Sequence, residues 1–333
     1  MEIGVLYINA QGSRITRVGE RLLVRDRDDK ILEDVPFFRV KQVVCLGSVE
    51  ITGAAIIQLL RLGIDVVYMS LAGRFKCRLS NMNPAQVKCR QNQYAKAAEA
   101  GFRLRIARAM LSGKLLNAKS FLVRRNRPAC EAVSDSIWKI ATALEMLGAA
   151  QTPDELMGIE GIAAREYFNG YRYLLKQDLG FSERNRRPPK DPVNAMLSFG
   201  YTLLYNMVLA AVEQVGLDAY LANLHAIQDR RPSLALDLME EFRVITVDMV
   251  VMRLVNLVRV RPIDFFFDDA KGTRMREQTI ALLTGELQAR LRAKVADPLT
   301  QNQFPIKDLL RRQAYQYRAV VSGERDEYLP VVI

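Results

Sequence analysis

The first 80 residues carry short apolar segments of the kind that form β-strands. Some are continuous runs rich in valine and isoleucine, and others alternate polar with apolar residues. Residues 54–62 form one short amphipathic stretch, which predicts a helix that ends at Gly63 because glycine is favoured just after a helix. The pattern predicts strands at residues 4–8, 14–18, 21–25, 40–46, 64–69 and 74–79.

After residue 83 the apolar spacing becomes helical and stays so to about residue 320. Asn83, Thr152 and Asp191 are each followed by proline, the combination typical of a helix start. Thr273 is expected to cap a later helix with an apolar stripe at 280, 283, 287 and 291. We therefore predict a two-domain α+β fold, with a small N-terminal β-sheet or β-sandwich domain over residues 1–80 and a larger all-α domain over 84–333.

One predicted helix could be mistaken for a membrane span. Residues 192–212 contain no charged residue and are long enough to cross a bilayer. They also include polar side chains such as Asn194, Ser198 and Tyr201, which suit a helix buried in a helical domain. Neither a signal peptide nor a CxxC pair is visible, so we expect a cytoplasmic protein with reduced, buried thiols and no membrane contact.

Basic residues are in excess and clustered. The formal net charge is +11, which favours a polyanionic partner such as DNA, RNA or an acidic membrane surface. A basic enzyme without a nucleic-acid role remains an alternative on charge alone. One cluster is Arg184, Arg186, Arg187 and Lys190, whose intervening prolines suit an extended path along a phosphate backbone. The other comprises Arg103, Arg105, Arg108, Lys114, Lys119, Arg124, Arg125 and Arg127.

The candidate chemistry centres on the single histidine and three acidic positions. His225 precedes a charged loop, and Asp237, Glu240 and Glu241 follow on one predicted helix. Acids three or four positions apart repel each other on a helix, so a bound cation or a basic neighbour would relieve them. The alternatives are a histidine with no ligand role and a solvated acidic face.

Glu160 lies between glycines. Gly158 and Gly161 are expected to let another helix approach closely, and a carboxylate in such packing needs a partner. Carboxylates with one imidazole make an oxygen-rich site, which suits Mg²⁺ or Mn²⁺ better than structural zinc. Such an ion can act as a Lewis acid on a phosphodiester.

Four segments together resemble one family, CRISPR-associated protein 1, the integrase and endonuclease of spacer acquisition in antiviral defence. They are MGIEGIAAR at 157–165, RNRRPPKDPVN at 184–194, LSFGYTLLYN at 197–206 and PSLALDLMEEFR at 232–243. The chain departs from the family pattern in two places. Arg230 replaces a glycine usually found in the loop after His225, and residues 244–246 replace a usual proline.

The resemblance implies a function, ligands and partners. The metal ligands would be Glu160, His225 and Glu240, with Asp237 beside them as a further catalytic residue. A homodimer would join the small ferredoxin-like CRISPR-associated protein 2, and a protospacer 3′-hydroxyl would attack the CRISPR repeat. The expected DNA-binding residues are Arg165, Arg184, Arg186, Arg187 and Lys190.

We therefore predict a metal-dependent DNA endonuclease and integrase. Two alternatives stay open from the residues themselves. One is a general metal-dependent DNA nuclease without an integration role, and the other is a non-catalytic basic scaffold that binds DNA.

Overall fold

The computed structural model describes residues 4–71, 75–81, 87–186, 188–268 and 272–333. By its internal contacts the chain divides into two compact units. The first, the β unit, comprises residues 1–82 and 275–284, and the second, the helical unit, comprises 83–274 and 285–333. The β unit therefore includes a later segment that a contiguous boundary near residue 80 does not anticipate.

The first sheet of the β unit is mixed. Its strand order is β1-β5-β7-β8, with β1, β5 and β7 parallel and β8 antiparallel to β7. Strands β5 and β7 are buried on both faces over most of their length, as parallel strands usually are, whereas β1 alternates buried with partly exposed residues. The strands are β1 Gly4–Ile8, β5 Val40–Leu46, β7 Asp65–Met69 and β8 Phe75–Leu79.

The second sheet has the order β4-β3-β2-β6. Strands β4, β3 and β2 are antiparallel neighbours, and β6 runs parallel to β2. The sequence pattern missed β4 because its first four residues are exposed, and β6 because it has only three residues. The strands are β2 Ser13–Val18, β3 Arg21–Arg25, β4 Ile31–Pro36 and β6 Val49–Ile51.

One core joins both sheets and helix α1, Gly53–Arg61. Ile15 and Leu22 come from the second sheet, Val43 from the first and Leu59 from α1, and all four are fully buried. Gly63 follows α1 with φ +68, the left-handed conformation predicted for it. Burial of these side chains in a common core supplies the main stabilisation of the unit.

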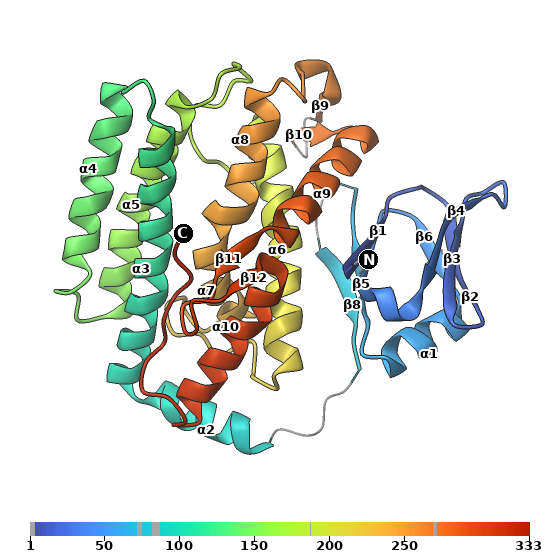
Figure 1. The fold of residues 1–333 in the computed structure, drawn as a ribbon, viewed down its shortest axis with the longest axis horizontal. Coiled ribbons are helices and arrows are strands. Elements are labelled where there is room, and N and C mark those ends of the chain that lie inside the picture. The colour runs from blue at the N-terminus through green and yellow to red at the C-terminus, as the bar shows by residue number, and fades with distance from the viewer. Residues whose placement is uncertain (1–3, 72–74, 82–86, 187, 269–271) are drawn as a thin grey trace. The chain divides into compact units, whose positions relative to one another are not determined.

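The helical unit contains the long helices. In Figure 1, α3, α4 and α5 run side by side, in agreement with their mutual packing. Helix α9 begins in the part of the chain that groups with the β unit. The helices are α2 Val87–Ala98, α3 Ala100–Arg125, α4 Glu131–Met146, α5 Pro153–Tyr173, α6 Pro192–Gln214, α7 Ser233–Arg243, α8 Met249–Asn256, α9 Glu277–Arg292 and α10 Ile306–Val321.

Two of the predicted helix starts are confirmed. The Thr152 hydroxyl accepts the N–H of Glu155 at 3.2 Å, and the Asp191 carboxylate accepts that of Asn194 at 2.8 Å. Asn83 and Pro84 lie outside the described residues. The prediction for Thr273 is wrong, because it lies in strand β10 and α9 starts only at Glu277.

The expectation of an all-α second domain is also wrong. Short strands pair as β9 with β10 and as β11 with β12. Each has three or four residues, too few to show the alternation by which a strand is recognised in sequence. Short 3₁₀ turns also occur at Phe37–Arg39 and Pro262–Asp264. The strands are β9 Phe265–Asp268, β10 Gly272–Met275, β11 Lys294–Ala296 and β12 Gln303–Pro305.

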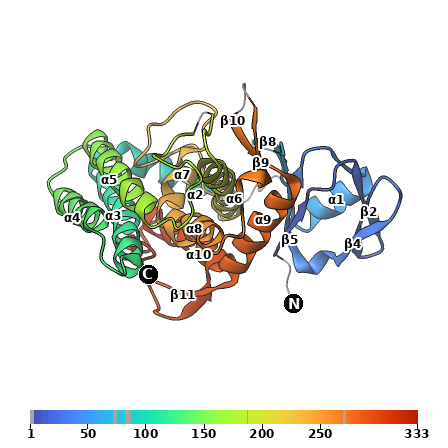
Figure 2. The ribbon, with the colours of Figure 1, turned by 90° about the horizontal axis from the view of Figure 1, so that it is seen from above.

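Helix α6 is the charge-poor segment. By length and composition it is the one described helix that could cross a membrane, but 72% of its apolar window is buried in the protein. Figure 2 shows α6 end-on within the helical unit, and it packs against α7, α8 and α10. Asn194 and Asn206 are buried along it. These contacts are those of the core helix that the sequence indicated.

The cysteines are free. Cys45 and Cys89 are buried, as expected for all four, whereas Cys77 is exposed and Cys130 is partly exposed. The expectation is therefore wrong for Cys77. It lies on β8, the edge strand of its sheet, whose first three residues are exposed although they alternate between the two faces.

Candidate active site

Helix α7 is buried along almost its whole length, acids included. Asp237, Glu240 and Glu241 are 0%, 3% and 1% exposed. A solvated acidic face is therefore excluded. Burying carboxylates is costly unless each is neutralised or hydrogen-bonded, so each must have partners. The three acids point to three different sets of partners.

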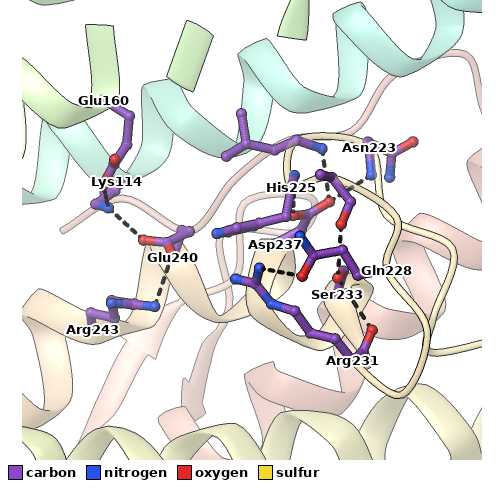
Figure 3. Close-up of polar contacts among 12 residues, drawn as sticks. Lys114, Glu160, Asn223, His225, Gln228, Arg231, Ser233, Asp237, Glu240 and Arg243 are labelled. Carbon is purple, nitrogen blue, oxygen red and sulfur yellow. Dashed lines mark hydrogen bonds and ion pairs between the residues drawn. The ribbon is translucent and has the colours of Figure 1, made fainter. Parts of the chain in front are cut away.

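Glu240 meets Glu160 through a shared lysine. Lys114, from α3, donates a hydrogen bond to Glu160 on α5, and its Nζ lies 2.6 Å from Oε2 of Glu240 (Figure 3). The guanidinium of Arg243 lies 3.0 Å from Oε1 of Glu240. Two acids and two bases from three helices therefore form one buried ionic cluster.

Electrostatics keep Glu240 ionised. Burial alone would raise the pKa of this carboxyl, but the charges of Arg243 and Lys114 outweigh burial and lower the pKa to about 2. Burial would lower the pKa of the Lys114 ammonium, yet Glu240 and Glu160 raise it. Both groups are charged at neutral pH.

The glycines beside Glu160 do not serve the role expected of them. A side-chain carbon placed on Gly158 or Gly161 would meet no other atom within 4 Å, and both residues are exposed. The expected close approach of a second helix is therefore wrong. The glycines lie on the solvent side of α5, and Lys114 reaches Glu160 from α3 instead.

His225 is oriented by Asp237. Oδ1 of Asp237 lies 2.6 Å from the ring Nδ1 and also accepts the backbone N–H of His225, at 3.1 Å. Its Oδ2 accepts the N–H groups of Asn223 and Leu224, at 2.6 and 2.9 Å. A carboxylate can only accept, so Nδ1 carries the proton and Nε2 is left with the lone pair that a cation requires.

The predicted ligands fit a cation by type and in part by position. Among the described residues, no three His, Cys, Asp or Glu side chains converge closely enough to hold a metal ion. Glu160 and Glu240 nevertheless already converge on one cation, the Lys114 ammonium. Oε2 of Glu240 is buried, and among the described residues its partner is the ion pair with Lys114, without a hydrogen bond of good geometry. Two carboxylates and a nearby imidazole are donors that Mg²⁺ and Mn²⁺ accept.

The loop after His225 holds an unusual backbone. Arg230 has φ +62, in the left-handed region that favours glycine. This is the position where the family pattern has glycine and this chain has arginine. The loop therefore keeps a glycine-like turn at the expense of local strain.

A second buried cluster, which the sequence did not reveal, borders the first. After α7 the chain makes a π-helical turn, Val244–Asp248, across the residues that replace the family's proline. Asp248 accepts hydrogen bonds from Tyr167, at 2.9 Å, and from Tyr201. The Arg243 guanidinium lies 4.9 Å from the centre of the Tyr201 ring, which connects the two clusters.

The charge of Asp248 is finely balanced. Burial raises the pKa of Asp248 to about 6, although the hydrogen bonds from Tyr201 and Tyr167 partly offset burial. A lone acid within the apolar run 244–252 was the available sequence signal. π-turns often occur at functional sites, which agrees with a place beside Arg243 and Glu240.

Glu241 faces away from the site, towards the segment Tyr328–Ile333. It accepts hydrogen bonds from the Tyr328 hydroxyl, the Val331 N–H and the Gln313 amide. Burial raises the pKa of Glu241 to about 7. Glu241 therefore anchors a segment of chain. Its spacing on the helix had suggested instead that it would join Asp237.

The predicted DNA-binding residues differ in exposure. The Arg165 side chain is 75% exposed, and Arg186 and Lys190 are exposed in an irregular segment. Arg184 instead turns inward and donates to Asn194 at 2.6 Å and to Ser198 at 3.0 Å. Its guanidinium is thus engaged within the fold. Arg187 lies outside the described residues.

The cluster on α3 is not a single basic surface. Arg108 donates to the backbone carbonyls of Leu147 and Ala150, at the end of α4. Arg125 stacks over the ring of Phe121, 3.8 Å from its centre. Lys114 belongs to the ionic cluster described above. These residues stabilise the helical unit, so closeness in sequence overstated the basic surface.

The family model described as CRISPR associated protein Cas1 matches residues 6–289. The CRISPR-associated endonuclease Cas1 3 of Thermus thermophilus is 32% identical, covering 99% of this chain and 98% of its own. A casposase bound to integration product has a TM-score of 0.87 at 21% identity, and the match covers 99% of this chain and 93% of that one. This similarity shows the fold. A chain of a Cas6-RT-Cas1–Cas2 complex has a TM-score of 0.81 at 25% identity, and the match covers 98% of this chain and 36% of that one. The match of the family model over most of the chain and the identity to the Thermus relative show that this chain belongs to the Cas1 family of CRISPR-associated proteins.

Proposed function

We propose that this protein is a metal-dependent DNA endonuclease and integrase, which inserts protospacer DNA into a CRISPR array. The observation that carries the proposal is the meeting of Glu160 and Glu240 at one cation position, beside a histidine oriented by Asp237. The endonuclease name of the Thermus relative supports it. In the joining step, a 3′-hydroxyl attacks a repeat phosphodiester and the repeat strand leaves with its own 3′-oxygen.

The residues have distinct tasks in this proposal. Glu160, His225 and Glu240 would hold Mg²⁺ or Mn²⁺, and the ion would supply charge neutralisation at the phosphate and help to deprotonate the attacking hydroxyl. Asp237 holds the imidazole with Nε2 available. Arg243 fixes the Glu240 carboxylate from the opposite side. Burial around these groups strengthens their electrostatic interactions.

DNA would be held mainly through its backbone. Arg165, Arg186 and Lys190 are exposed and can reach phosphates, whereas Arg184 supports the segment from inside. Arg187 is proposed to contact DNA on its sequence alone. The proposed assembly is a homodimer joined to Cas2 in the cytoplasm. The name of the Cas1–Cas2 complex above supports the Cas2 partner, whereas the homodimer and the cytoplasmic location are proposed from the family resemblance and the sequence.

The test is the joining of a labelled DNA 3′ end into a repeat-bearing plasmid. We expect products with Mg²⁺ or Mn²⁺ and none in chelator or in Glu160→Gln and His225→Ala. Metal-dependent cleavage without joining would indicate a general nuclease instead. DNA binding without either reaction would indicate the non-catalytic scaffold.

Matched substitutions on α7 separate coordination from packing. We expect Glu240→Gln to lose nearly all activity and to recover little with added Mn²⁺. Glu241→Gln changes the adjacent buried carboxylate, which faces away from the site, and should stay active. Asp237→Asn should keep weak activity that rises with Mn²⁺, because groups that orient a ligand typically contribute about 10–100-fold. An inactive Asp237→Asn with an active Glu240→Gln would reverse the assignment.

A further inference from the structure

We propose that Lys114 makes metal binding depend on DNA. In the DNA-free protein its ammonium holds the cation position between Glu160 and Glu240, and it yields that position when a divalent ion and a phosphodiester bind together. The inference rests on the proposed function, because it concerns the same carboxylates. It adds a residue that controls when the site is loaded.

The contacts show that Lys114 competes for the ligands themselves. Its Nζ contacts Glu160 and lies 2.6 Å from Oε2 of Glu240, and its side chain is 12% exposed. These are the carboxylates that an ion would use. A divalent ion and an ammonium cannot both lie between them without strong like-charge repulsion at this distance.

The local charges explain why DNA would tip the balance. Glu160, Asp237 and Glu240 carry three negative charges, and Lys114 and Arg243 carry two positive charges. The cluster therefore has a net charge of one negative. A divalent ion alone would leave it one positive while buried, and a phosphodiester would return it to neutral.

Lys114 has a flexible stem. A lysine side chain carries a compact charge on four methylenes, so its ammonium can move without a change in helix α3. The side chains of Lys114 and Glu160 are 12% and 19% exposed, so the contact between them is partly accessible to solvent. A phosphate oxygen of bound DNA offers the displaced ammonium a new anionic partner.

Coupling of this kind is reciprocal. If DNA tightens metal binding by some factor, the metal must tighten DNA binding by the same factor. Removing the competing ammonium should strengthen metal binding in the free protein and weaken the coupling. A lysine that only holds Glu160 and Glu240 in place would give the opposite result, because its loss would disorder the ligands.

The experiment measures Mn²⁺ affinity by electron paramagnetic resonance, with and without a DNA duplex. Wild-type protein should bind Mn²⁺ at least about tenfold more tightly with DNA, within the usual range of coupling. Lys114→Met without DNA should bind Mn²⁺ at least about tenfold more tightly than wild type, with a smaller effect of DNA. Lys119→Met removes the same charge from the same helix and should behave as wild type.

Each outcome decides between the interpretations. Equal or weaker Mn²⁺ binding by Lys114→Met overturns the inference. A wild-type Mn²⁺ affinity that DNA does not change also overturns the inference. This measurement needs no variant, so it remains a test even if Lys114→Met fails to fold. Lys114→Gln provides a second, polar variant with the same expected direction. If wild type joins DNA only with Mn²⁺ yet shows no coupling, the inference alone fails, whereas no Mn²⁺ binding under any condition removes the proposed function.

Discussion

Glu241→Gln should change the pH dependence of stability in a direction opposite to the usual one for a buried acid with partners. Glu241 has a pKa near 7 in the folded protein against 4.5 for an exposed glutamate. Between these values the folded protein binds more protons than the unfolded chain. The free energy of unfolding contributed by Glu241 is therefore fully present below about pH 4.5 and is lost as the pH rises through 7.

The magnitude follows from the two pKa values. One pKa unit corresponds to about 1.4 kcal/mol, so ionisation of Glu241 costs the folded state about 3 kcal/mol at high pH. Most of that loss, about 2–3 kcal/mol, falls between pH 5 and pH 8. Glutamine carries no charge, and its one amide oxygen can accept from Tyr328 or from Val331, which donate to different oxygens of Glu241. The loss of the other hydrogen bond lowers stability equally at both pH values. Relative to wild type, the variant should gain that amount between pH 5 and pH 8.

The assay is denaturant unfolding of wild type and variant at pH 5 and at pH 8. The effect of the substitution on the free energy of unfolding is measured at each pH, and the two effects are then compared. Other titrating groups, including Asp248, cancel in this comparison. Glu240→Gln is the matched control on the same helix. Because the pKa of Glu240 is lowered to about 2, the effect of that substitution should be constant from pH 5 to pH 8. A constant effect for Glu241→Gln as well would show that its hydrogen bonds outweigh burial and would refute the reasoning.

Three further predictions concern the basic residues. Replacing Arg186 and Lys190 by Ala should weaken DNA binding. It should also flatten the slope of log affinity against log salt concentration by up to about 1.8, at about 0.9 per phosphate contact. A slope that stays unchanged in a salt titration would exclude this segment from the DNA path. Arg184→Ala should instead lower the free energy of unfolding by about 2 kcal/mol in denaturant unfolding, because it removes buried charged hydrogen bonds. Arg230→Gly should raise the free energy of unfolding by up to about 1 kcal/mol by relieving φ +62, whereas Arg231→Gly should lower it, and equal effects would argue against strain at residue 230.

The sequence pattern predicted elements that bury a regular face. Strands β1, β5 and β7 could be predicted because each is a short apolar run, and β5 and β7 are buried on both faces over most of their length. Strand β4 was not, because Ile31 and Leu32 are exposed on it and carry no alternation. The pairings of β9 to β12 are decided by contacts in the folded chain, which no local pattern records.

The site was predictable in its acids and histidine but not in its bases. The residue types and the family resemblance indicated Glu160, His225, Asp237 and Glu240. The structure places them in two pairs, one around Lys114 and the other formed by the histidine and Asp237. Lys114 could not be distinguished from the other basic residues of its helix. Its role depends on which face of α3 meets α5 and α7, a property of tertiary packing.

The π-helical turn at Val244–Asp248 takes up one residue more than an α-helical turn would. Because the wider turn absorbs that residue, α8, Met249–Asn256, continues with nearly the rotational phase of an uninterrupted helix one residue shorter. Its Val251 and Val255 therefore stay in the core, while the turn presents Asp248 to the hydroxyls of Tyr167 and Tyr201. Removing one residue from the turn should spare the buried face of α8 and alter only the groups of the turn. Removing one residue within α8 should instead rotate the residues that follow by about 100° and disrupt the core.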